Sequence, residues 1–146
     1  MSQNDWLIFV VIQMAMIACA FWEAYIEGPE GWAARQVGWK IKFGSFTYTA
    51  YHFWLYWVMI PLLLALPLVA DGWDAHLFWV LVFAYTIGAT IEDFMWFVVN
   101  PVYPLKKFNR HKTAWHSWVK IVKVDIPTSY IIRAIVSIVI YWFFLR

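Results

Sequence analysis

Long apolar runs alternate with shorter polar segments along the chain. The apolar runs occupy residues 6–26, 47–70, 77–99 and 127–144. Each run is close to the ~20 residues that an α-helix needs to cross the hydrocarbon of a bilayer. The pattern predicts an all-α, polytopic membrane protein in which four transmembrane helices form an up-down bundle. Because the runs take up most of residues 1–146, we expect a single membrane domain.

The polar segment between the third and fourth runs has an amphipathic pattern. One helical face gathers mostly apolar side chains, namely Phe108, His111, Trp115, Trp118, Val119 and Val122. The other face gathers Asn109, Lys112, His116, Lys120 and Lys123. Such a division is typical of a helix that lies in the plane of the membrane interface. The sequence predicts an amphipathic interfacial helix over residues 108–123.

Composition agrees with this architecture, and charge adds an orientation. Only 14% of the residues are charged and 64% are hydrophobic, whereas soluble domains have about 25% charged residues. Nine of the eleven Lys and Arg residues lie within residues 27–47 and 101–127. The positive-inside rule therefore predicts that both long loops are cytoplasmic and both termini are outside. We expect a bacterial or archaeal cytoplasmic membrane, with the basic loops near anionic lipid headgroups rather than nucleic acid.

Ionisable residues interrupt all four apolar runs near the same depth. Glu23 comes late in the first run and His52 early in the second, whereas Glu92 and Asp93 come late in the third and Arg133 early in the fourth. In an up-down bundle these positions lie within about two helical turns of the cytoplasmic surface. An ionisable residue within hydrocarbon costs ~3 kcal/mol or more and marks a candidate functional site. The four runs together predict one polar site.

A metal centre is the first chemical interpretation of this site. Carboxylates and imidazoles on facing helices are the ligands with which bundle proteins hold iron, zinc or manganese. The predicted ligands are Glu23, His52, Glu92, Asp93 and a loop histidine, either His111 or His116. A haem held by His52 and one loop histidine is an alternative, but it leaves the carboxylates without a role.

A second interpretation needs no metal. Carboxyl groups in an apolar setting, here Glu92 and Asp93, can act as general acid and base. Arg133 and the backbone N–H groups at the start of the fourth helix would then bind a phosphate or carboxylate. Such a site at the interface would accept a substrate dissolved in the membrane, such as a phospholipid, an isoprenoid or a quinone.

Purely structural roles are open for the same side chains. Glu92 or Asp93 can form an ion pair with Arg133 that serves only to fix the register of the helices. Glu27 and Glu30 are interpreted as ordinary loop carboxylates. The sequence contains no phosphate-binding glycine motif, no Gly-x-Ser-x-Gly, no His-Glu-x-x-His and no pair of cysteines.

The predicted function is accordingly that of a metal-dependent membrane enzyme that acts on a lipid-like, isoprenoid or quinone-like substrate. The first alternative is a non-catalytic accessory or assembly subunit whose buried ion pairs lock the bundle. The second alternative is an oligomeric channel or carrier, because four spans without repeats are too few for a usual single-chain transporter.

Overall fold

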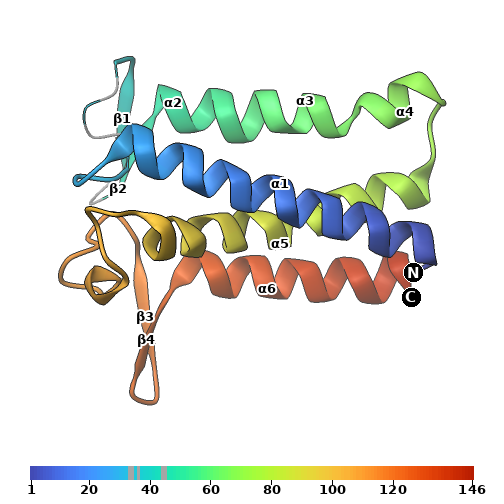
Figure 1. Cartoon of the computed structure of the whole chain (residues 1–146). Helices are drawn as coiled ribbons and strands as arrows, with labels where there is room; N and C mark the ends of the chain where they lie inside the picture. The colour runs from blue at the N-terminus through green and yellow to red at the C-terminus, as the bar shows by residue number, and fades with distance from the viewer. Residues whose placement is uncertain (33–34, 36, 44–45) are drawn as a thin grey trace.

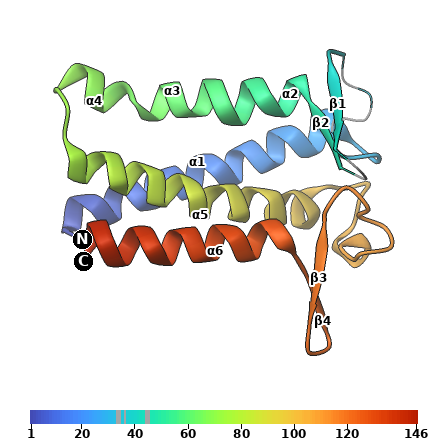
Figure 2. The same cartoon turned by 180° about the vertical axis from the view of Figure 1, so that it is seen from behind.

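The computed structural model describes residues 1–32, 35, 37–43 and 46–146. Four helical segments run alongside one another: α1 (Gln3–Glu27), residues 50–70, α5 (Ala75–Val99), and α6 (Thr128–Ile140) continued by the π-helical η3 (Tyr141–Leu145). Both termini lie at one end of the bundle and two β-hairpins lie at the other (Figure 1). The view from behind shows the same arrangement (Figure 2).

Helix α1 begins and ends at residues suited to helix termini. The Ser2 hydroxyl accepts a hydrogen bond from the Asp5 N–H at 3.2 Å, and the Asp5 carboxylate accepts one from the Ser2 N–H. This reciprocal capping box satisfies backbone donors that the first turn leaves unpaired. At the other end Gly28 has φ +62°, a conformation that ends the helix and that glycine adopts at little cost.

Helix α5 packs closely against α1 along small residues. The Asp74 carboxylate caps its first turn, and the helix then runs beside α1 through two clusters of buried apolar side chains. A Cβ atom added at Gly88 would lie 2.7 Å from the Met16 Cγ. Gln13 Nε2 donates a hydrogen bond to the Ala84 carbonyl at 3.0 Å across the same contact. The α1–α5 pair is therefore the closely packed part of the bundle.

The second helical segment is irregular because prolines remove backbone donors from it. Strand β2 (Phe46–Thr49) leads into α2 (Ala50–His52), π-helical η1 (Phe53–Met59), α3 (Ile60–Leu64) and α4 (Leu66–Ala70). Pro61 lies at the start of α3 and Pro67 at the start of α4. The apolar run predicted over residues 47–70 thus begins as a strand and is interrupted at Ala65.

Within the described residues, three helices are long and apolar enough to cross a membrane, namely Gln3–Glu27, Ala75–Val99 and Thr128–Leu145. The remaining apolar helix, Ala50–Leu64, is shorter. The predicted helical class is confirmed, and helices occupy all four predicted runs. That all four cross a bilayer stays a prediction.

The predicted interfacial helix over residues 108–123 is wrong. After the 3-10 turn η2 (Leu105–Lys107), the chain forms turns and then a hairpin of β3 (Trp118–Ile121) and β4 (Val124–Pro127). The Asn109 side chain accepts hydrogen bonds from the backbone N–H groups of His111 and Lys112 at 3.1 and 3.2 Å. These bonds stabilise a turn where a helix was expected. The β-branched residues that follow favour paired strands.

A second hairpin joins β1 (Lys40–Phe43) to β2, with Lys40 opposite Thr49. Both hairpins extend from the same end of the bundle (Figure 1). The two loops that hold most of the basic residues therefore lie together at one end, beside the ends of α1 and α5.

We predict that Gly88→Leu destabilises the α1–α5 contact, because any side chain at this position meets Met16. Inserting extra atoms into a packed interface typically costs ~1–3 kcal/mol. Thermal unfolding in detergent should occur at a lower temperature than in the wild type. Ala134→Leu adds similar bulk at an exposed position of α6 and is the control. Equal unfolding temperatures for the two variants would contradict close packing at Gly88.

Candidate functional site

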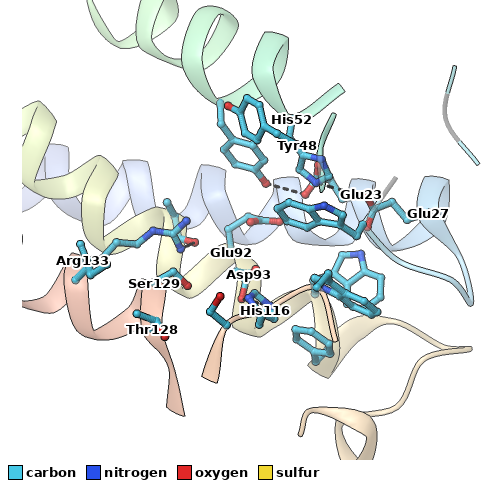
Figure 3. A pocket seen from close by; sticks show the side chains of 18 of the residues that line it. Glu23, Glu27, Tyr48, His52, Glu92, Asp93, His116, Thr128, Ser129 and Arg133 are labelled. Carbon is cyan, nitrogen blue, oxygen red and sulfur yellow. Dashed lines mark hydrogen bonds and ion pairs between the residues drawn. The ribbon is translucent and has the colours of Figure 1, made fainter. Parts of the chain in front are cut away.

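A cavity of about 420 Å³ lies at the hairpin end of the bundle (Figure 3). Its acidic and basic lining residues are Glu23, Glu27, His52, Glu92, Asp93, His116 and Arg133. Helix α1 contributes the two glutamates of its last turns, and α5 contributes Glu92 and Asp93. His52 ends α2, Arg133 lies in α6 and His116 precedes strand β3. The structure thus brings residues of all four helical segments and one loop to a single cavity.

Glu23, Glu92 and Tyr56 form the part of the cavity between α1, α5 and η1, here called the glutamate cluster. Glu23 and Glu92 are each only 4% exposed. The Tyr56 hydroxyl donates a hydrogen bond to Glu23 Oε2 at 2.7 Å. The Glu92 carboxyl interacts with the Glu23 carboxyl and with the Tyr56 hydroxyl. Two carboxyls from different helices therefore meet away from water.

One oxygen of the glutamate cluster has no donor. Glu23 Oε1 is buried and makes no hydrogen bond to any described residue. The Tyr51 hydroxyl interacts with the Glu23 carboxyl but does not reach hydrogen-bonding geometry. Its other close neighbour, Glu92, contributes a second set of acceptor oxygens when ionised. A buried acceptor without a partner is costly, so this oxygen indicates a place for a donor.

His52 lies beside the glutamate cluster, and its imidazole contacts Thr49, Glu27 and Trp32. Its Nδ1 is 2.6 Å from Thr49 Oγ1, and its Nε2 is 3.8 Å from Glu27 Oε1. The Trp32 ring stacks on the imidazole with a centroid distance of 4.0 Å. Since Thr49 also caps α2, the start of this helix determines where the imidazole lies.

Asp93 faces a different set of groups, here called the aspartate cluster, which consists of Asp93, His116 and Tyr130. The Tyr130 hydroxyl donates a hydrogen bond to Asp93 Oδ2. His116 Nε2 lies 3.4 Å from the same oxygen but does not form a hydrogen bond with it. Burial lowers the pKa of His116, and the nearby Asp93 carboxylate opposes this effect. The imidazole is therefore expected to be neutral at pH 7.

Arg133 is directed at the backbone rather than at a carboxylate. Its NH1 donates a hydrogen bond to the Ala89 carbonyl at 2.9 Å. Within the described part of the chain, no carboxylate lies within 4.0 Å of its guanidinium nitrogens. The ion pair of Arg133 with Glu92 or Asp93, considered from the sequence as a device for helix register, is not formed.

The cavity also shows what the sequence left undecided or missed. His116 lines it, whereas His111 is exposed in the turn after Asn109. Glu27, interpreted from the sequence as a loop carboxylate, lies in the last turn of α1 and lines the cavity. Glu27 is four residues from Glu23, and this spacing places both side chains on one helical face. The spacing was the signal in the sequence that Glu27 belongs to the cavity. Glu30, by contrast, pairs with Arg35 at the surface.

The expected metal ligands are distributed over separate clusters. Among the described residues, no three His, Cys, Asp or Glu side chains are grouped so that they could hold a metal ion. Glu23 and Glu92 belong to the glutamate cluster, whereas Asp93 and His116 belong to the aspartate cluster. His52 is engaged by Thr49. The arrangement therefore does not fit an iron, zinc or manganese centre.

The two buried histidines do not suit a haem either. The Trp32 ring lies 4.0 Å from the ring of His52 and 6.5 Å from that of His116, measured between centroids. This indole therefore occupies space beside both imidazoles. A flat porphyrin ligated by both histidines would have to displace it.

No known protein family matches the chain, and no curated protein or solved structure is significantly similar to it. Site geometry is in any case a better basis for function than fold likeness.

We predict that Asp93→Asn lowers the pKa of His116 further. The carboxylate favours the charged imidazolium, and the amide removes this effect while keeping the shape of the side chain. An NMR titration of histidine-labelled protein in detergent measures the change, with the signal assigned from the spectrum of His116→Gln.

Asp74→Asn, at the opposite end of α5, is the matched control and should leave the His116 titration unchanged. A His116 pKa that stays the same or rises in Asp93→Asn would show that the two side chains do not interact as described.

Proposed function

We propose that this chain is a membrane-embedded enzyme that transfers protons to and from a membrane-dissolved amphiphile bound in the cavity. The observation that supports this proposal is the meeting of Glu23, Glu92 and Tyr56 at a cavity of about 420 Å³. Buried ionisable groups that converge in a pocket are characteristic of catalytic sites.

Two facing carboxyls are suited to acid–base catalysis. Two negative charges at close range repel each other strongly away from water, so the pair is most stable with one proton between them. One carboxyl can donate this proton to the substrate while the other accepts a proton from it, and the total on the pair is unchanged. Positioned acids and bases of this kind contribute ~10²–10⁴-fold to a reaction rate. Tyr56 fixes the orientation of Glu23.

The proposal assigns this chemistry to side chains alone. The metal-dependent form expected from the sequence requires ligands that converge on one point, and the described carboxylates and imidazoles do not converge in this way. Asp93, Tyr130 and His116 would hold α5, α6 and the loop before β3 together at the cavity, and would not bind a cofactor.

The orientation proposed from charge puts the cavity near the cytoplasmic surface. Strand β1, which holds Lys40 and Lys42, lies at the hairpin end of the bundle. Lys106 belongs to η2, which follows and contacts α5. With this end cytoplasmic and both termini outside, α1, residues 50–70, α5 and α6 would all cross the bilayer. A membrane-dissolved substrate would then reach the cavity from the inner leaflet.

The alternative is an accessory or assembly subunit in which the same groups lock the helices together. The hydrogen bonds between elements favour this role. The bond from Tyr56 to Glu23 joins η1 to α1, and the bond from Tyr130 to Asp93 joins α6 to α5. In that role the carboxyls contribute to stability and transfer no protons.

We predict that Glu92→Gln abolishes proton transfer and leaves the fold largely intact. Purified protein in D₂O, incubated with the lipid extract of the membranes in which it was expressed, should replace a carbon-bound hydrogen of its substrate by deuterium, and this label remains after O–H and N–H groups have exchanged back in H₂O. Mass spectrometry of the lipids detects this label. Incorporation should fall at least ~100-fold in Glu92→Gln, the lower end of acid–base contributions.

Glu30→Gln is the matched control, since it removes a surface carboxylate that pairs only with Arg35 in an exposed contact. Its incorporation should equal that of the wild type. Absence of label from the wild type, together with a strongly lowered unfolding temperature in Glu92→Gln, would favour the structural subunit.

A further inference from the structure

An apolar groove adjoins the glutamate cluster. It has a volume of about 370 Å³ and runs between α1 and the segment η1–α3. Cys19 and Trp22 of α1 lie at the end nearest Glu23, and Leu55 and Met59 flank Tyr56 on the opposite wall. The polar cavity and the apolar groove therefore lie between the same two helical segments, where Cys19 of the groove interacts with Glu23 and Tyr56 of the cavity.

The groove is long enough to hold a hydrocarbon chain. Its lining extends along α1 from Ile12 to Trp22, which is ~15 Å at 1.5 Å per residue. Apart from the thiol of Cys19 and the indole N–H of Trp22, its described lining side chains are hydrocarbon or thioether groups. A surface of this kind is stabilised by an apolar chain rather than by water.

The charge of the adjoining cavity favours a positive ligand. Four carboxyl-bearing residues line it, at Glu23, Glu27, Glu92 and Asp93, against the guanidinium of Arg133. That guanidinium already donates to the Ala89 carbonyl. The carboxyls of the glutamate cluster face each other, and Glu23 Oε1 is left without a donor. A protonated nitrogen placed between them would supply the missing hydrogen bonds and neutralise their repulsion.

Aromatic rings around the carboxyls strengthen this preference. The indoles of Trp32, Trp57, Trp96 and Trp115 line the cavity together with Tyr48 and Tyr56. The faces of such rings attract organic cations, and aromatic walls combined with carboxylates are a common way to bind ammonium groups.

We propose that the site binds a cationic amphiphile with a single chain, its protonated amine between Glu23 and Glu92 and its hydrocarbon chain in the groove between α1 and α3. This inference rests on the proposed function and deepens it, because it names the class of substrate. The ammonium group balances the single negative charge of the proton-sharing pair, and the chain extends away from the hairpin end of the bundle.

Head-group selectivity in the wild type tests the proposal without any variant. Binding of radiolabelled dodecylamine to the protein in phosphatidylcholine nanodiscs is measured, with binding to empty nanodiscs subtracted. Unlabelled dodecylamine should displace the label at least tenfold better than dodecanol, dodecyl sulfate or butylamine. Equal displacement by dodecanol, or better displacement by dodecyl sulfate, would overturn it, the latter in favour of an anion site at Arg133.

Two variants then test where the amine and the hydrocarbon chain of the ligand bind. Glu23→Gln should weaken dodecylamine binding at least tenfold, whereas Glu30→Gln should leave it unchanged. Ala15→Trp adds bulk to the groove, about two helical turns from the carboxyl of Glu23, and should weaken the binding of dodecylamine without changing the weak binding of butylamine. Full dodecylamine binding in both Glu23→Gln and Ala15→Trp would refute the assigned position.

The binding assay tests the cationic substrate, and the deuterium assay tests the proposed enzyme, so each proposal can be refuted without the other. Selective amine binding without deuterium incorporation would leave this inference standing and remove the proposed enzyme. Deuterium incorporation that depends on Glu92, with no preference for amines, would keep the enzyme and remove the cationic substrate.

Discussion

Carboxyl groups within apolar helices need polar partners on other elements, and the arrangement of this bundle follows from that need. Apolar side chains offer no hydrogen-bond donors, so an unpaired carboxyl buried among them is expensive. Glu23 is satisfied in part by a hydroxyl from η1, and Asp93 by a hydroxyl from α6. Consecutive residues of a helix point ~100° apart, so Glu92 and Asp93 face different neighbours. Helix α5 therefore takes part in two polar clusters at one depth.

Packing differs between the two sides of α1, and this difference creates the site. On one side small residues bring α5 close, and at Gly88 there is no room for a side chain. On the other side, the proline-interrupted segment leaves a groove beside α1. A hydrogen bond from the Tyr85 hydroxyl to the Tyr56 carbonyl connects this segment to α5. A tight helix pair thus holds the carboxyls in place while a looser partner leaves space for a ligand beside them.

The sequence predicted which ionisable side chains lie at one level better than it predicted which of them touch. Depth is set by counting residues along helices in an up-down bundle, so Glu23, His52, Glu92 and Arg133 were expected at one level, and all of them line one cavity. Which of them touch depends on rotation about each helix axis and on packing, and these are not readable from residue types. A set of carboxylates and histidines indicated a metal, yet their directions separate them into two clusters.

The loop between α5 and α6 was the least predictable part. The sequence of residues 108–123 has a helical periodicity, but no helix forms there. The hydrogen bonds of Asn109 stabilise a turn, and the β-branched residues that follow form a hairpin. Because the loop is not a helix, helical phase could not choose between His111 and His116. The position of Trp118 opposite Pro127 in the hairpin holds the preceding residues, including His116, over the end of α5.

The adjacency of Glu92 and Asp93 also limits how this protein can vary in length. A single residue inserted into α5 before Glu92 would turn both side chains by ~100° and move them ~1.5 Å along the axis. Glu92 would leave Glu23, Asp93 would leave Tyr130, and no compensating change at one position could restore both contacts. Insertions and deletions in such a chain should be confined to the hairpins and the turn near Gly72, while α5 keeps a constant number of residues.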